Sequence, residues 1–143
     1  ERAPIYTRPR YLPATRFSCN MRLKHCIVGE GAHLEESDIE HSVVGIRSIV
    51  RRGSTIRNSI LMGADYYNEP KELVGEVKYE LPIGIGRNCR IENAIIDKNA
   101  RIGDGCVIVN ERGVQNEDHK DYLVRDGIVI VPRKTQLAEG TVI

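Results

Sequence analysis

The stretch that decides the fold is IENAIIDKNARIGDGCV, residues 91–107, which divides into one pentapeptide and two hexapeptides. The pentapeptide Ile91–Ile95 is followed by hexapeptides that start at Ile96 and Ile102. Each hexapeptide begins with an aliphatic residue and carries a small residue at its fifth position. Because a strand alternates its faces, a six-residue unit predicts a short strand plus a corner, with the aliphatic and the small residue both turned inward.

The same unit recurs on both sides of this stretch. Residues Ile39–Thr55 form a second 17-residue rung of one pentapeptide and two hexapeptides. Further pentapeptides are Leu23–Ile27 and Ile56–Ile60, and further hexapeptides start at Val28, Ile85, Val131 and Leu137. One rung alone cannot enclose its aliphatic residues, but stacked rungs bury a continuous column. The repeat therefore predicts an all-β fold, a parallel β-helix of hexapeptide-type repeats.

Two polar stretches interrupt the repeat, residues 64–82 and residues 109–126. A short helix is considered at the centre of the first. Loops that leave one face of a repeat protein often form its binding surface, although plain surface loops and covers for a strand edge are alternatives. Residues 1–13 are rich in proline and arginine and are predicted to be a linker or arm, which leaves 14–143 for the β-helix domain. Glycine at the second hexapeptide position is interpreted as a requirement of a tight corner; these residues are Gly29, Gly45, Gly86 and Gly103.

Composition narrows the class of protein. The 143 residues are 41% hydrophobic but only 5% aromatic, so Ile, Val and Leu must fill the core. Lys and Arg total 21 against 20 Asp and Glu, which argues against a nucleic-acid or membrane partner. No apolar run reaches membrane-spanning length. The four cysteines form no CxxC pair, which favours a reduced, cytoplasmic compartment.

The sequence offers no catalytic residues and no metal ligands. Cys26, Cys89 and Cys106 fall at small-residue positions and are predicted to be packing residues, whereas Cys19 lies outside the repeat and is undecided. His25 and His41 share an outward pentapeptide position but lack a nucleophile or a carboxylate in a catalytic pattern, and His119 is interpreted as a solvated loop residue. No metal-ligand spacing occurs, and no glycine pattern matches a nucleotide-binding loop. No cofactor is therefore predicted for this domain.

Separated cations are the remaining candidates for a binding site. Arg8 and Arg10 lie in the arm, Lys98 lies at an outward hexapeptide position, and Arg133 projects from the final rungs. Cations that converge on a small anion hold phosphate esters, Arg through bidentate contacts and Lys as a point charge. Spacing alone leaves open the alternative that these are scattered surface charges.

The hexapeptide pattern resembles the left-handed β-helix of acyltransferases and of the C-terminal domains of sugar nucleotidyltransferases. A more specific set of motifs, in order along nearly the whole chain, resembles the glucose-1-phosphate adenylyltransferase family, closest to its plant and cyanobacterial branch. These motifs include APIYTRPRYLP (3–13), HSVVG (41–45), LMGADYY (61–67), PIGIG (82–86), AIIDKNARIG (94–103), GIVIV (127–131) and GTVI (140–143).

This resemblance implies a left-handed helix and a role in an enzyme that uses Mg²⁺ to convert ATP and glucose 1-phosphate into ADP-glucose and pyrophosphate. The family's catalytic domain is N-terminal and has no counterpart here, so the chain is expected to be the C-terminal regulatory and oligomerisation domain, inactive alone. Family members are tetramers, with identical or different subunits, and a plant member would lie in the plastid stroma.

The family's contacts to an allosteric phosphorylated metabolite match Arg8, Arg10, Asp65, Lys98 and Arg133. Arg8 stands where the branch usually has Gln, and Arg133 where it usually has Lys. Two other classes remain open: a stand-alone acyltransferase with a catalytic histidine, and an assembly module without a ligand.

Overall fold

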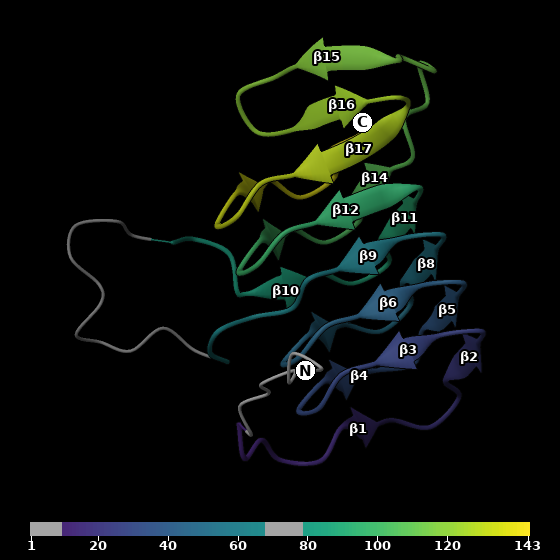
Figure 1. The fold of residues 1–143 in the computed structure, drawn as a ribbon, viewed down its shortest axis with the longest axis vertical. Helices are drawn as coiled ribbons and strands as arrows, with labels where there is room; N and C mark the ends of the chain where they lie inside the picture. Colours follow the sequence, from purple (N-terminus) through teal and green to yellow (C-terminus); the bar gives the residue numbers. More distant parts are fainter. Residues whose placement is uncertain (1–9, 68–78) are drawn as a thin grey trace, which may run out of the picture.

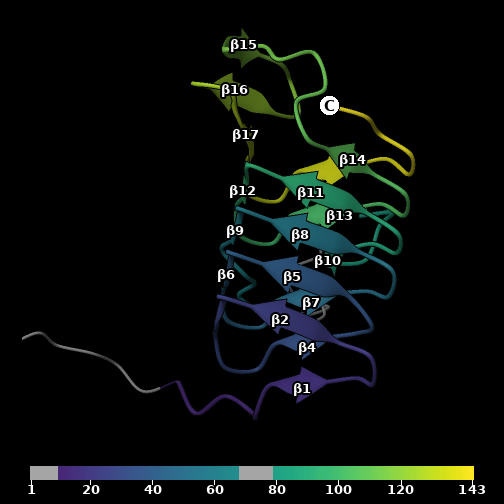
Figure 2. The ribbon, with the colours of Figure 1, turned by 90° about the vertical axis from the view of Figure 1, so that its right-hand side faces the viewer.

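The computed structural model describes residues 10–67 and 79–143, and over these residues the chain winds into stacked rungs (Figure 1). The short strands of successive rungs line up as three sheets, which form the three sides of the stack (Figure 2). All elements of the described residues are strands, so the all-β prediction is confirmed. The helix considered at the centre of the first insertion falls on residues outside the described part.

The strands are grouped by sheet. The first sheet has the order β1 (Arg16–Phe17), β4 (His33–Leu34), β7 (Ile49–Val50), β10 (Gly84–Ile85), β13 (Arg101–Ile102), β18 (Gln136–Leu137). The second has the order β14 (Val107–Ile108), β11 (Arg90–Glu92), β8 (Thr55–Arg57), β5 (Asp38–Glu40), β2 (Arg22–Lys24). The third has the order β15 (Asn116–Asp118), β16 (Leu123–Arg125), β17 (Ile128–Val131), β12 (Ala94–Ile96), β9 (Ile60–Leu61), β6 (Val43–Val44), β3 (Ile27–Val28).

The strand register confirms the predicted rung. Parallel pairing places Asp38 opposite Thr55 and Arg90 opposite Val107, each one 17-residue rung apart. Thr55 pairs with Arg90, 35 positions later, because the first insertion intervenes between those two rungs. On the neighbouring sheet Val50 pairs with Ile85 across the same gap. The insertion therefore leaves and rejoins the stack without breaking the ladder.

Columns of aliphatic residues fill the interior, one for each sheet. Val50 and Ile102 on the first sheet and Ile56 and Ile91 on the second are at most 2% exposed. Burying one such side chain stabilises the fold by about 1.5–3 kcal/mol. The columns are Leu34, Val50, Ile85, Ile102, Leu137; Ile39, Ile56, Ile91, Ile108; and Val44, Leu61, Ile96, Val131.

Small residues next to these columns accept or donate hydrogen bonds between rungs. Ser54 Oγ donates to the Gly86 carbonyl at 2.8 Å, and in the next rung Cys89 Sγ donates to the Gly103 carbonyl at 3.2 Å. Cys89 and Cys106 are buried, which confirms their predicted packing role. Cys26 is only half-buried, because it lies in one of the first rungs, and Cys19 is exposed.

The glycines at the second hexapeptide position are not required by a tight corner, so the reason predicted for them was wrong. None of the four has a positive φ; the left-handed corner residues are instead at the fourth hexapeptide position, such as Asn88 and Asn99, and at the third pentapeptide position, such as Asn58. A Cβ built on Gly86 would lie 2.5 Å from the Gly103 carbonyl oxygen of the adjacent rung. These glycines are required because neighbouring rungs approach there backbone to backbone.

The second predicted insertion, 109–126, contains paired strands and is not a plain polar loop. Strands β15 and β16 form an antiparallel hairpin, and β16 pairs with β17 at the end of the third sheet. Asp126 and Gly127, both with positive φ, make the two-residue turn between β16 and β17. The stack thus ends in an antiparallel extension (Figure 1). His119 is exposed in this hairpin, stacked on Tyr122.

Candidate functional site

Three of the predicted site residues meet at the corner between the third and the first sheet, where β9, β12 and β17 end. The rungs are stacked in register there: the Asn99 amide donates to the Gly63 carbonyl, and the Lys134 amide donates to the Lys98 carbonyl. Lys98 and Arg133 both hold the third position of their hexapeptides. Stacking therefore places them on successive rungs at one corner.

Asp65 lies between these two cations. Its Oδ1 is 3.3 Å from Lys98 Nζ, and its Oδ2 is 2.7 Å from Arg133 Nη2. Asp65 is the second residue of the first insertion, so its side chain reaches the corner as the chain leaves the stack. Lys98 and Asp65 side chains are 29% and 31% exposed, whereas Arg133 is 56% exposed. The cluster, named here the corner site, is thus open to solvent on the Arg133 side.

A buried amide fixes Asp65 in this place. Asn99, 1% exposed and at φ +60°, accepts the Asp65 backbone N–H on Oδ1 at 2.8 Å. Its Nδ2 donates back to Asp65 Oδ2 at 2.9 Å. A left-handed corner favours asparagine, and this one also has a side chain that satisfies both groups of Asp65. The main chain of Asp65 is therefore anchored independently of the two cations.

The charges of the corner site favour an anion. Hydrogen bonding from Asn99 lowers the pKa of the Asp65 carboxyl, and Lys98 and Arg133 lower it further, against the opposing effect of burial. At neutral pH the corner site therefore holds two cations and one carboxylate, with one positive charge in excess. A cationic corner with exposed guanidinium donors is suited to an external phosphate.

The arm contributes two residues to the predicted site, Arg8 and Arg10. Arg8 lies outside the described residues, and Arg10 is exposed, with no ion pair to any described residue. The arm does pass the same corner lower in the stack, where the Leu12 Cβ is 3.6 Å from a Cβ built on Gly31. Tyr67 lies there as well, and its hydroxyl donates to the Gly31 carbonyl at 2.7 Å. The arm and the start of the insertion therefore share one edge of the molecule.

The end of the first insertion is also fixed to the stack. Arg101, 5% exposed, donates from Nη1 to the Leu81 carbonyl at 2.6 Å, and its guanidinium lies 4.2 Å from the Tyr79 ring centre. Gln136 Oε1 accepts the Leu81 amide at 3.2 Å. Arg101 therefore has a structural role and is not one of the cations that face the corner site.

A narrow cavity behind the corner is too small for a metabolite. Arg47, Gly63, Asp97 and Ala100 are among its lining residues, and its volume of about 20 Å³ holds about one water molecule. A ligand of the corner site must therefore bind on the outer surface.

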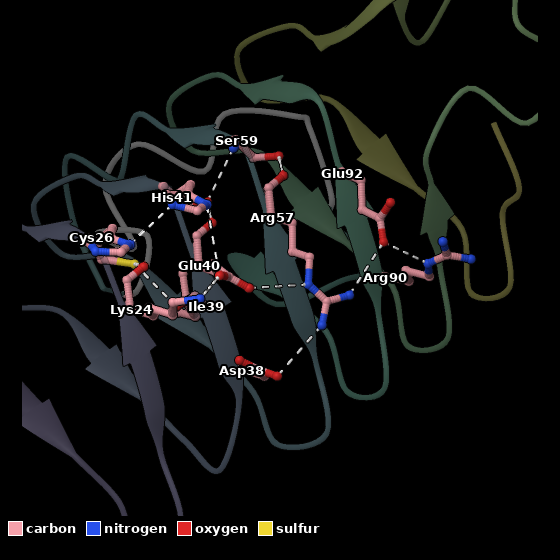
Figure 3. A network of polar contacts seen from close by, with 12 residues as sticks. Lys24, Cys26, Asp38, Ile39, Glu40, His41, Arg57, Ser59, Arg90 and Glu92 are labelled. Atoms are coloured by element: carbon pink, nitrogen blue, oxygen red, sulfur yellow. Dashed lines mark hydrogen bonds and ion pairs between the residues drawn. The ribbon is translucent and has the colours of Figure 1, made fainter.

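The second sheet has many charges but no comparable site. Lys24, Glu40, Arg57 and Glu92 stand opposite one another on successive rungs, with alternating charge (Figure 3). Lys24 Nζ is 2.7 Å from Glu40, and Arg57 is 3.8 Å from Glu40 and 3.7 Å from Glu92. Since two cations alternate with two carboxylates, the ladder is neutral. Its opposite charges therefore favour the correct register of the rungs more than they favour the binding of a charged ligand.

The histidines of the acyltransferase alternative form a pair. His25 Nδ1 lies 3.1 Å from His41 Nε2, and the rings stack at 4.9 Å between centroids. Both residues are left-handed corner residues, with φ of +52° and +47°. No group of three His, Cys, Asp or Glu side chains among the described residues is arranged to hold a metal ion.

An exposed aliphatic row on the third sheet was missed by the sequence analysis. Ile27, Val43 and Ile60 stand in register and are 70%, 38% and 43% exposed. Ile95 and Ile130 continue the row and are half-buried. The available signal was the pair of aliphatic residues where each pentapeptide ends and the next repeat begins, such as Ile27-Val28. Because strands alternate, one member of each pair must point outward. This row is named here the outer stripe.

The comparisons with known proteins agree with this fold. The family model described as the GLGC left-handed parallel beta-helix domain matches residues 10–142. The chain is 41% identical to "Glucose-1-phosphate adenylyltransferase large subunit 1, chloroplastic/amyloplastic" of Zea mays over 99% of its own length and 28% of that protein. It is 45% identical to "Glucose-1-phosphate adenylyltransferase small subunit, chloroplastic/amyloplastic" of Triticum aestivum, over 99% of the chain and 30% of that protein.

The chain thus spans less than a third of the length of these curated relatives. The described residues include no helix long and apolar enough to cross a membrane. The parallel register, the three sheets and the family match together establish the predicted fold, including its left hand. This chain belongs to the family of the GLGC left-handed parallel β-helix domain.

Proposed function

We propose that this chain is the C-terminal regulatory and oligomerisation domain of a glucose-1-phosphate adenylyltransferase, which makes ADP-glucose and pyrophosphate for starch or glycogen synthesis. The support is an identity of 41–45% over 99% of the chain to subunits with that name. We assign catalysis and its Mg²⁺ to a separate N-terminal part of the full-length enzyme. The chain alone should therefore make no ADP-glucose.

The regulatory part of the proposal assigns the corner site to a phosphorylated metabolite. The observation that carries it is the convergence of Lys98 and Arg133, 35 positions apart, on one exposed point at Asp65. Lys98 supplies a point charge and Arg133 a forked set of donors, which together suit a phosphate ester. Arg8 and Arg10 are proposed to complete the site from the arm, since the arm runs along the same edge at Leu12.

Activation curves of the full-length enzyme test this assignment. Each charge-assisted contact contributes about 1.5–3 kcal/mol, so Lys98→Ala or Arg133→Ala should raise the half-activating concentration of a phosphate ester roughly ten- to a hundredfold. Lys120→Ala is the matched control, because Lys120 is an 82% exposed cation in the distant hairpin. If both corner variants kept the wild-type curve with every phosphate ester in a panel, the effector site would lie elsewhere.

The assembly part of the proposal assigns the outer stripe to the remainder of the enzyme. The stripe is a continuous apolar row on one open sheet face. In both relatives, the part that the chain does not match is more than twice as long as this chain. Apolar rows of this kind are normally covered by another domain or subunit. We infer that the catalytic part, and through it a homo- or hetero-tetramer, covers the third sheet.

A charge placed in the outer stripe tests this arrangement. Ile60→Asp in the full-length enzyme should reduce its size in light scattering, because a buried unpaired carboxylate is costly at an interface. Val142→Asp is the control, since Val142 is 58% exposed and lies outside the stripe. If Ile60→Asp left both the size and the thermal unfolding temperature of the enzyme unchanged, neither the catalytic part nor another subunit would cover the stripe.

A further inference from the structure

We propose that Asp65 is an internal competitor of the effector: its carboxylate occupies the place between Lys98 and Arg133 that a phosphate group takes. This inference rests on the proposed regulatory function of the corner site and adds how that site is controlled. It also makes Asp65 the residue that sets which anions bind.

The contacts of Asp65 are those of a bound anion. Both carboxylate oxygens accept from cations on two different rungs, Oδ1 from Lys98 at 3.3 Å and Oδ2 from Arg133 at 2.7 Å. Both cations come from the third position of a hexapeptide, whereas Asp65 comes from the insertion. The repeat therefore builds the cationic pair, and the insertion adds an anion to it.

Release of this carboxylate breaks its bonds from Lys98, Arg133 and Asn99 Nδ2, donors that the entering phosphate must then satisfy, but it leaves the main chain anchored. The Asp65 backbone N–H remains bound to Asn99 Oδ1 at 2.8 Å, and two residues later the Tyr67 hydroxyl remains bound to the Gly31 carbonyl. Tyr67 also stacks on His33 at 5.0 Å between ring centres. The chain is thus fixed on both sides of the Asp65 side chain. Because that side chain is already 31% exposed, water can solvate the carboxylate after it turns away.

Competition of this kind selects dianions. A monocarboxylate that enters the corner site exchanges one carboxylate for another and gains little. A phosphate monoester carries nearly two negative charges and three acceptor oxygens, so it can satisfy Lys98 and Arg133 together better than Asp65 does. The partial exposure of the site keeps the Asp65 contacts weak enough for a dianion to displace them.

The test is whether Asp65→Asn in the full-length enzyme raises or lowers the affinity for phosphate. Half-saturating concentrations of inorganic phosphate and glycerol phosphate, followed by binding calorimetry and by activity, should fall roughly three- to tenfold. Acetate binding should rise by a similar factor and stay weaker than phosphate binding, because the loss of an internal competitor raises the apparent affinity of every anion alike. Asp65→Glu keeps the competing charge and should stay within about twofold of wild type, and Asp121→Asn in the hairpin turn is the unrelated control.

An unchanged or weaker affinity of Asp65→Asn for both phosphates would overturn the proposal and make Asp65 a positioning residue for the two cations. Asp65→Ser gives the same sign test if thermal unfolding shows that the Asn variant does not fold. Failure of this inference is distinct from failure of the proposed function. If Lys98→Ala abolishes the response while Asp65→Asn weakens it, the effector site stands without the competitor; if neither variant has an effect, the effector site itself is wrong.

Discussion

Gly86→Ala should destabilise the β-helix strongly, although the φ of Gly86 is not in the left-handed region. A Cβ at this position would lie 2.5 Å from the Gly103 carbonyl oxygen, 2.6 Å from its carbon and 2.7 Å from the Asp104 nitrogen. All three atoms are backbone atoms of the next rung, so no side chain can rotate away to make room. The adjacent rungs must separate instead.

The size of the effect follows from the contacts that this separation weakens. Restoring an ordinary carbon–oxygen contact requires an opening of about 0.7 Å between rungs that are normally about 4.8 Å apart. The hydrogen bonds from the Gly105 amide to the Arg87 carbonyl, 2.7 Å, and from Cys89 Sγ to the Gly103 carbonyl, 3.2 Å, span the same gap. Overpacking typically costs about 1–3 kcal/mol and each weakened hydrogen bond about 1 kcal/mol, so we expect a loss of about 3–5 kcal/mol.

Urea unfolding of the chain followed by circular dichroism measures this loss, with an expected fall in the midpoint of about 1–3 M. Gly105→Asn is the matched control. Gly105 has φ +69° and no atom within 4 Å of a built Cβ, and Asn88 already holds the same corner one rung away. The control should change stability by less than about 1 kcal/mol. A Gly86→Ala midpoint within error of the control would refute the close-approach explanation.

Three further predictions concern single side chains. Cys89→Ser should cost no more than about 1.5 kcal/mol in urea unfolding, because Ser54 donates to the equivalent carbonyl one rung away. Native Cys89 should react slowly with a thiol reagent. It is only 2% exposed, and its hydrogen bond with Cys106 and its burial raise the pKa of its thiol. Asn58→Val should cost about 2 kcal/mol and Asn58→Gly almost nothing in thermal unfolding, because φ is +47° there; equal costs would count against a backbone origin. Folding lowers the pKa of the Asp65 carboxyl, so the ionised form stabilises the fold above the unfolded pKa, and this gain is lost as pH falls through the folded pKa. The stability advantage of the wild type over Asp65→Asn should therefore be full near neutral pH and shrink below roughly pH 4. An advantage that does not depend on pH would contradict this prediction.

The rungs could be predicted from sequence because their signal is local. Every six residues an aliphatic side chain must return to the interior, and the register that joins Asp38 to Thr55 follows directly from the 17-residue unit. The hairpin of β15 and β16 was not predicted, since its strands, NED and LVR, carry charges and no aliphatic period. The Asp126-Gly127 pair directly before the strand Ile128–Val131 was an available hairpin signal, because this dipeptide favours a type I′ turn.

The corner site was predictable only in part. Lys98 and Arg133 share a hexapeptide position, so stacking of the repeats alone brings them near each other. Their pairing with Asp65 could not be derived in this way, because Asp65 lies in an insertion whose path depends on the Asn99 side chain. The family resemblance supplied Asp65 as a member of the site, and the geometry supplies its contacts.

A phosphate titration of the isotope-labelled chain, followed by the NMR shifts of its backbone amides, tests directly whether an anionic effector binds at the corner site. We expect inorganic phosphate and glycerol phosphate to shift the same set of amides with one dissociation constant: those of Asp65, Lys98, Asn99, Arg133 and Lys134. Lys98→Ala should remove these shifts, and Lys120→Ala should leave them unchanged. Shifts confined to another face, or no saturable shift at the corner between the third and the first sheet, would contradict the claim that this β-helix holds an anionic effector there.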